Sequence, residues 1–179
     1  TVYSLKRDFE TASADYVQLI FDTFSDATNA FQFQTNHIGL KGDLLVSNGN
    51  RDPRLDRNKS WDAIWYVESK LYNDFFLTEL KIPLDQLYYG NNSKKWRFNM
   101  YRSDTNGQEH SVWSKVPQNQ SIGNLAFMGN LIFEEPFSKS RDNSYSGFLS
   151  SRCQDILYWT FGGTPHEIQD NEEFYNNDW

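Results

Sequence analysis

The fold of this chain is constrained most by its short, aromatic-rich segments, which are separated by turn-forming residues. Residues 30–36 alternate apolar and polar side chains, the pattern of a strand with one face in water. No segment shows a long helical period. Further strands are predicted at residues 16–21, 40–46, 60–70, 75–82, 95–102, 110–113 and 125–133. Strands at this spacing, joined by polar turns, predict an all-β fold, an antiparallel β-sandwich or jelly roll.

Aromatic side chains supply much of the predicted core. They make up 17% of the chain, close to half of the 38% that is hydrophobic. Because aromatic residues bury large areas and favour strands, such a chain builds a core with few aliphatic residues. The single cysteine, Cys153, excludes an intrachain disulfide and a cysteine-based zinc site.

The net charge restricts the partners that the chain can bind. Lys and Arg number 17 and Asp and Glu number 24, which gives a formal charge of −7. Because an acidic chain repels phosphate backbones, nucleic acid is not an expected partner. No stretch approaches the roughly 20 apolar residues of a membrane helix, so no membrane span is expected within this chain.

A change of composition near Pro136 places a domain boundary there. Residues 1–135 form the predicted sandwich domain, with its core at residues 15–133. Residues 136–179 are rich in Ser, Asn and acidic residues and are predicted to be a polar linker or tail. One apolar island at residues 156–161 is a strand candidate that would pair elsewhere and could pair with another chain.

Several pieces of the sequence, in this order, resemble one known family. They are residues 22–26 (DTFSD), 31–36 (FQFQTN), Gly39, Asp43, 60–65 (SWDAIW), 78–83 (TELKIP), 99–102 (NMYR) and Trp113. Together they resemble the family 9 carbohydrate-binding modules, in the divergent form that precedes a β-barrel in a group of poorly characterised Gram-negative outer-membrane proteins. The resemblance covers about two-thirds of the chain, residues 15–133.

The resemblance implies a noncatalytic β-sandwich that binds an oligo- or polysaccharide through aromatic rings, with structural calcium in some members. It also implies a place in the cell envelope, associated with the outer membrane, in the periplasm or at the cell surface. Family members begin with additional strands, so this chain is expected to lack its N-terminal strands. The alternative is a docking or assembly domain that no longer binds sugar and contacts other envelope proteins.

Three tryptophans are candidates for a carbohydrate-binding surface. Trp61 and Trp65 lie four residues apart, so on a strand both would face one side of the sheet. That side either packs into the sandwich core or exposes an indole ring. Trp113, near a strand end and among polar residues, is the stronger candidate for an exposed ring. Arg102 and Asn99 are candidates for the polar rim, with a salt bridge as the alternative role of Arg102.

Three aspartates are candidates for a calcium site. Asp22 and Asp26 flank a strand-end loop, and Asp43 interrupts an apolar run and is the candidate third ligand. Their spacing does not follow the EF-hand pattern. The alternative is that Asp22 and Asp26 each cap a turn by accepting backbone N–H groups, and that Asp43 marks a bulge.

Catalysis is not expected from this sequence. It contains no nucleophile elbow and no glycine-rich phosphate loop. A glycoside hydrolase would need two converging carboxylates, and Glu68 and Glu79 are placed to face each other across a predicted hairpin. Because Lys70 and Lys81 lie on the same hairpin, cross-strand charge pairing is the simpler interpretation.

Overall fold

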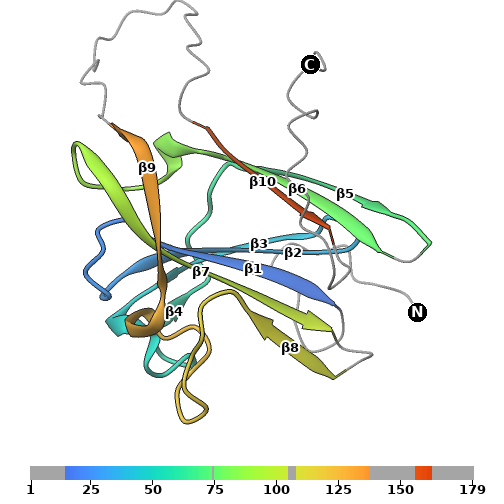
Figure 1. Cartoon of the computed structure of the whole chain (residues 1–179), viewed down its shortest axis with the longest axis horizontal. Helices are drawn as coiled ribbons and strands as arrows, with labels where there is room; N and C mark the ends of the chain where they lie inside the picture. The colour runs from blue at the N-terminus through green and yellow to red at the C-terminus, as the bar shows by residue number, and fades with distance from the viewer. Residues whose placement is uncertain (1–14, 74, 105–107, 138–155, 163–179) are drawn as a thin grey trace, which may run out of the picture.

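In a computed structural model, the chain forms a sandwich of antiparallel sheets (Figure 1). The structure describes residues 15–73, 75–104, 108–137 and 156–162. The strands are β1 (Tyr16–Asp22), β2 (Ala30–Asn36), β3 (Lys41–Val46), β4 (Arg57–Asn58), β5 (Tyr66–Leu71), β6 (Phe76–Pro83), β7 (Ser93–Asp104), β8 (Glu109–Val112), β9 (Gly129–Phe137) and β10 (Ile156–Gly162). Short 3-10 turns form η2 (Asn48–Asn50), η3 (Leu84–Gln86) and η4 (Leu125–Phe127).

The larger sheet has seven strands, and β7 organises it. The order is β4-β3-β2-β1-β7-β8, and β9 also pairs with β7. One edge of β7 pairs with β1 from Arg97 to Ser103. The other edge pairs with β9 up to Phe98 and with β8 from Tyr101 onward. A gap between β8 and β9 therefore lies beside the middle of β7.

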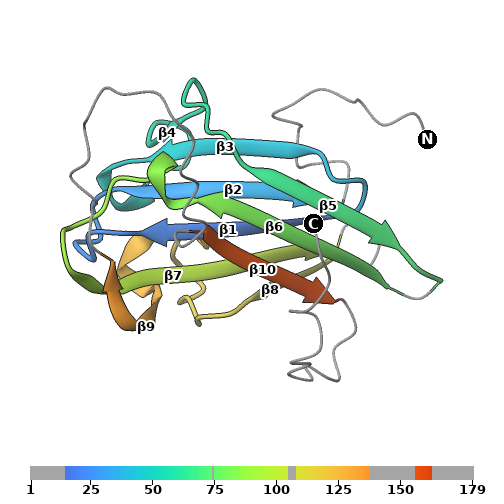
Figure 2. The same ribbon diagram turned by 90° about the horizontal axis from the view of Figure 1, so that it is seen from above.

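The smaller sheet contains β10, β6 and β5 in that order and lies over the larger sheet (Figure 2). β10 pairs antiparallel with β6, from Ile156 opposite Pro83 to Gly162 opposite Leu77. The strand island predicted at residues 156–161 is thus paired within this chain. Residue 136, where the composition changes, lies inside β9, and most of the predicted tail lies outside the described residues.

The main core lies between the two sheets and is mostly aromatic. Phe21, Phe33 and Trp96 are fully buried and face Leu80 and Ile82 of the smaller sheet. The rings meet edge to face, as in the pair Phe21–Trp96, whose centroids lie 6.4 Å apart at 77°. Such pairs add about 0.5 to 1.5 kcal/mol each to the hydrophobic gain, which explains how a core with few aliphatic residues is stable.

A second core covers the opposite face of the larger sheet. Ile20, Leu44 and Val46 point away from the sandwich interior and pack with Leu125 and Met128 from the loop around η4. Every residue of β2 is therefore buried, although its sequence alternates apolar and polar residues. The polar residues of β2 do not lie in water as the alternation predicts, because loops cover that face.

The all-β, antiparallel sandwich predicted from the sequence is confirmed, and three local predictions are wrong. Residues 61–65 are not a strand, and β5 begins only at Tyr66. β9 begins at Gly129 instead of residue 125, because η4 precedes it. The region 47–60, whose sequence rich in Asn, Asp, Arg and Pro and without periodicity predicts a long exposed loop, contains the short strand β4 and several buried residues.

Candidate functional site

Trp113 lies at the gap between β8 and β9 and is 54% exposed. Its backbone N–H donates to the Met100 carbonyl of β7 at 2.9 Å. The indole packs against the Phe98 ring, with the centroids 5.5 Å apart, and lies over Gly129 of β9. A Cβ atom at Gly129 would come within 2.3 Å of the indole. The absence of a side chain at Gly129 therefore makes room for one face of the indole. Much of the rest of the indole is open to solvent.

Asn99 holds the backbone beside this ring. The Ser114 N–H donates to Asn99 Oδ1 at 2.8 Å, and Asn99 Nδ2 donates to the Ser114 carbonyl at 3.3 Å. The Ser114 hydroxyl in turn donates to the Phe127 carbonyl at 2.9 Å. Asn99 is buried, so the structure does not place it on a polar rim as predicted. Its position is that of a clamp for the segment that carries Trp113.

A depression of about 200 Å³ opens beside Trp113, on the face of β7 and β8 that points toward the smaller sheet. We call it the Trp113 depression. Arg102 of β7 lies opposite Ser111 of β8 in the depression, and the next pair on this face, Asp104 opposite Glu109, lies at its edge. The residues that line it are Met100, Arg102, Glu109, Ser111, Val112 and Trp113. The structure therefore brings together two of the predicted residues, Trp113 and Arg102.

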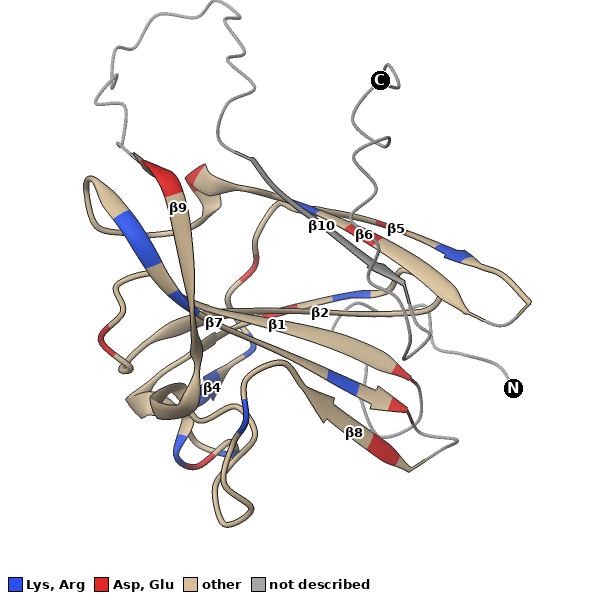
Figure 3. Cartoon of the chain, viewed as in Figure 1, with Lys and Arg blue, Asp and Glu red and all other residues tan. Residues whose placement is uncertain are grey.

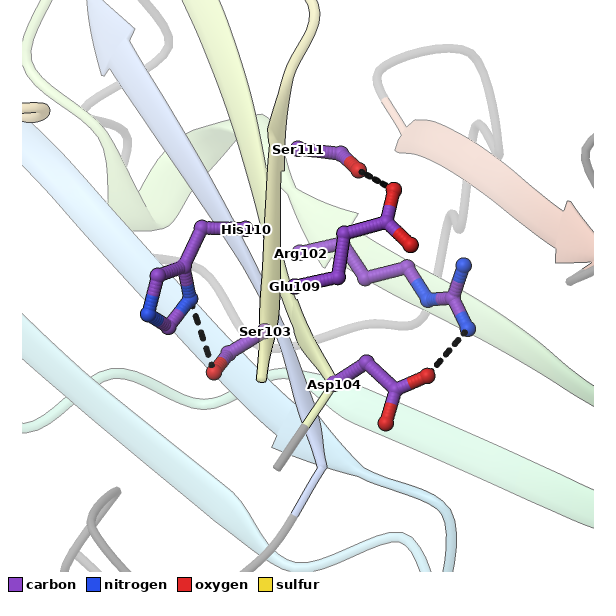
Figure 4. Close-up of polar contacts among 6 residues, drawn as sticks. All are labelled: Arg102, Ser103, Asp104, Glu109, His110 and Ser111. Carbon is purple, nitrogen blue, oxygen red and sulfur yellow. Dashed lines mark hydrogen bonds and ion pairs between the residues drawn. The ribbon is translucent and has the colours of Figure 1, made fainter. Parts of the chain in front are cut away.

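The polar side chains of the depression offer both hydrogen-bond donors and acceptors (Figure 4). Arg102 Nη2 lies 3.9 Å from Asp104 Oδ2, and the Ser111 hydroxyl donates to Glu109 Oε1 at 3.4 Å. Arg102 Nε is buried and has no hydrogen-bond partner within the described part of the chain. Figure 3 shows the same mixture of charges at the ends of β7 and β8.

The opposite face of the β7–β8 hairpin is fixed by His110. Its Nδ1 lies 2.7 Å from the Tyr101 hydroxyl and 3.3 Å from the Ser103 hydroxyl, and its ring stacks on Tyr101. Figure 4 shows His110 and Ser103 on the side of the hairpin away from Arg102 and Glu109. These contacts stiffen the short strand β8 from behind and so support the depression.

The other two candidate tryptophans pack into the core. Trp65 is 1% exposed, meets Phe33 edge to face at 5.3 Å, and donates from Nε1 to Asp43 Oδ1 at 3.4 Å. Trp61 is partly buried, with ring contacts to Phe31 and Phe33. Of the two alternatives for this pair, the structure shows the packed one for Trp65, whose indole a ligand cannot reach.

The three aspartates predicted to bind calcium do not meet. Asp43 faces the sandwich interior and accepts the Ala63 N–H at 2.6 Å, whereas Asp22 alternates with Phe21 and faces the opposite side of the sheet. Asp26 Oδ1 accepts the Thr28 N–H at 2.8 Å. No group of three metal-binding side chains is found among the described residues. These residues therefore do not fit one shared calcium site.

Asp22 has instead the contacts of a turn cap. The carboxyl is fully buried and accepts the Ala27 N–H at 2.8 Å. Burial raises the pKa of Asp22, and the nearby Asp26 carboxylate adds to this, while backbone N–H groups oppose it.

Sequence analysis missed Glu109 and Gly129 as residues of this site. Glu109 was detectable, because residues 109, 111 and 113 of one extended segment share a face. Gly129 was not, because its contact with Trp113 joins β9 to the residue that follows β8, and these two strands are not paired with each other.

Comparison with known proteins gave no match: no protein-family model, no curated protein and no solved structure matches this chain. The likeness to the family 9 carbohydrate-binding modules therefore stays a prediction. Within the residues that the structure describes, no helix has the length and apolar character needed to cross a membrane.

Proposed function

We propose that this chain is a noncatalytic carbohydrate-binding domain and that the Trp113 depression holds the sugar. One observation carries the proposal. A large indole, 54% exposed, stands beside a guanidinium, a carboxylate and a hydroxyl in a single depression. Sugars have apolar C–H faces and a rim of hydroxyls, so they need a flat aromatic surface next to planar polar groups.

The chemistry of the depression matches those needs. The open side of the Trp113 indole would stack on the C–H face of a pyranose. Arg102 would donate hydrogen bonds to hydroxyl oxygens, and Glu109 would accept from hydroxyl hydrogens. The volume of about 200 Å³ is below the range of closed ligand pockets, about 300 to 1,000 Å³. Such an open site favours weak binding, with a dissociation constant of about micromolar to millimolar.

Isothermal titration calorimetry against mono- and oligosaccharides tests the proposal. Trp113→Ala should weaken binding of any ligand found by about tenfold or more, because the stacked ring is lost. Tyr66→Ala is the matched control, since Tyr66 is 53% exposed and lies on the smaller sheet, away from the depression. Equal titrations of native chain and Trp113→Ala would remove Trp113 from the site.

The same ligand tests the noncatalytic part of the proposal. Asp104 and Glu109 lie directly opposite each other beside the depression, and two facing carboxylates are the machinery of glycosidases. We expect an oligosaccharide to be recovered intact after long incubation with the chain. Release of reducing ends that stops in Glu109→Gln would instead identify this pair as catalytic.

The proposed setting is the cell envelope, in association with the outer membrane, and it rests on the family resemblance. Fractionation of the source cells tests it, with the chain expected in the envelope fraction.

The second candidate function is docking within an envelope protein complex, and an apolar hairpin tip favours it. Leu71 is 67% exposed at the β5–β6 tip, beside the stacked rings of Tyr72 and Phe75, whose centroids lie 4.6 Å apart. Leu71→Asp should abolish co-purification with an envelope partner and leave sugar binding unchanged. The opposite pattern would favour the carbohydrate-binding function.

A further inference from the structure

The charges around the Trp113 depression do not cancel. Arg102 Nη2 lies 3.9 Å from Asp104 Oδ2, so these two charges largely offset each other. Glu109 is exposed, and the hydrogen bond it accepts comes from the neutral Ser111 hydroxyl. Among the described residues, no Lys or Arg forms an ion pair with Glu109. Together with Asp104, which lies beside the lining residues, Arg102 and Glu109 therefore give this end of the hairpin a net charge of about −1 at neutral pH.

The register places the two carboxylates of this end of the hairpin next to each other. Asp104 and Glu109 are directly opposite each other on β7 and β8, a position in which like charges repel. Figure 4 shows both carboxylates on the side of the hairpin that carries Arg102. A cationic ligand group placed next to Glu109 would relieve this repulsion, whereas an anionic group placed there would add to it.

The position of Glu109 also suits a substituent on a stacked sugar. Glu109 and Trp113 lie four residues apart along the β8 segment, about 13 Å in an extended chain. Ser111 lies between Glu109 and Trp113 on the same face of this segment, and its hydroxyl contacts the Glu109 carboxylate. A saccharide chain of two or three rings that stacks on Trp113 would reach this carboxylate.

We propose that the Trp113 depression selects saccharides that carry a free amino group, such as oligomers of 2-amino-2-deoxyhexose, and disfavours uronic acids. The inference rests on the proposed carbohydrate-binding function and adds the class of ligand. The ammonium group pairs with the Glu109 carboxylate while the sugar ring stacks on Trp113. Ammonium groups are also attracted to the face of an indole, which adds to the preference.

Two ligands of equal length test the inference, a β-1,4-linked glucosamine trimer and its fully N-acetylated counterpart. Calorimetry at about pH 6 keeps the amines protonated and ordinary carboxyls ionised. At low salt we expect the glucosamine trimer to bind about three- to tenfold more tightly, because one exposed ion pair gains little more than this. Raising the salt concentration should shrink the ratio, since the charges are screened.

Glu109→Gln should bring the affinity ratio of the two trimers close to one. Glu79→Gln is the matched control, because it removes an exposed carboxylate from the smaller sheet and should keep the ratio. A ratio that survives in Glu109→Gln, or tighter binding of the acetylated trimer to the native chain, overturns the inference. A uronic acid trimer should bind more weakly than either, and tighter binding of it also overturns the inference.

The outcomes separate this inference from the function on which it rests. Equal binding of both trimers, lost in Trp113→Ala, would leave the carbohydrate-binding function standing and overturn the preference for amines. Binding of neither trimer nor any neutral sugar would overturn both. Ethanolamine, an amine without a sugar ring, should not compete, and competition as strong as that of the trimer would overturn the role of stacking.

Discussion

The β5–β6 and β7–β8 hairpins have similar sets of side chains but differ in what lies around the aromatic ring. On β5–β6, Glu68 and Glu79 are directly opposite each other, and Tyr66 is 53% exposed. The ammonium groups of Lys41 and Lys81 lie 5.6 and 5.8 Å from the centre of the Tyr66 ring. Cations of the chain itself thus already interact with this ring.

On β7–β8, Asp104 and Glu109 are directly opposite each other, and Trp113 is 54% exposed. The nearby cation, Arg102, is 3.9 Å from Asp104, and the indole rests on Phe98 instead of being covered by a lysine. The exposed fractions of the two rings are almost equal. Exposure alone therefore does not identify a ligand-binding ring, and the neighbours of the ring decide.

Each hairpin also adjoins a tryptophan, and the largest difference that we expect is in how much each tryptophan contributes to the free energy of unfolding. Trp65 precedes β5 and is fully buried, whereas Trp113 follows β8 and is half exposed. We expect Trp65→Ala to lower the free energy of unfolding by about 3 to 5 kcal/mol, the usual cost of removing a large buried ring. Trp113→Ala should cost less than half of that. Chemical denaturation measures both, and equal losses would show that Trp113 is a core residue.

The Asn99 clamp should have the next largest effect. Asn99→Ala removes two hydrogen bonds to the Ser114 backbone, which we expect to lower the free energy of unfolding by about 1 to 3 kcal/mol. Sugar affinity should also fall, because the segment with Trp113 loses its anchor. Thermal unfolding and calorimetry measure the two effects. Unchanged affinity in a destabilised variant would limit Asn99 to a structural role.

These contrasts show what sequence could and could not reveal. Alternation in residues 30–36 predicted the bounds of β2, because period-two patterning is local. The even spacing of Trp61 and Trp65 misled, because residues 61–65 are not a strand and the Asp43 carboxylate binds the Ala63 N–H there. The place of Trp113 near a strand end and among polar residues predicted an exposed ring, and the ring is 54% exposed. The gap between β8 and β9 beside it is long-range, and no local pattern encodes it.

Gly129 offers a way to block the Trp113 depression with little change to the fold. In Gly129→Ala the new methyl group would overlap the indole, so the half-exposed ring must swing away. We expect about a tenfold loss of sugar affinity, equivalent to about 1.4 kcal/mol. Gly90→Ala is the control, because no atom lies within 4 Å of its added Cβ. Unaltered sugar binding in Gly129→Ala would show that binding does not depend on the position of the Trp113 indole.

Two buried aspartates, Asp22 and Asp56, should make the free energy of unfolding depend on pH in opposite directions. The hairpin variants must therefore all be compared at one pH. Burial raises the pKa of Asp22 above 3.8, so the stability it contributes is present at low pH and lost as pH rises through the folded pKa. Hydrogen bonds from the Asp52 N–H and Asn48 lower the pKa of Asp56 below 3.8, so its contribution is lost as pH falls.

Thermal unfolding across the acid range tests these slopes. Relative to the native chain, Asp22→Asn should become more stable as pH rises above about 4. Asp56→Asn should become less stable than the native chain as pH rises toward about 4, and this deficit should shrink as pH falls, because the native chain then loses the Asp56 contribution. Parallel slopes for the two variants would contradict the assignment.

The smallest expected effect comes from uncovering the ring on the other hairpin. Lys81→Ala removes one of the two ammonium groups near Tyr66, and we expect it to change stability by no more than about 0.5 kcal/mol, as is usual for exposed positions. Sugar binding should remain sensitive to Trp113→Ala, because Lys41 still lies near Tyr66 and Tyr66 does not line the Trp113 depression. If Lys81→Ala instead created sugar binding that persists in the double variant with Trp113→Ala, an uncovered ring would be sufficient. The other groups of the Trp113 depression would then not be needed, because an exposed aromatic ring on any strand could bind the sugar equally well.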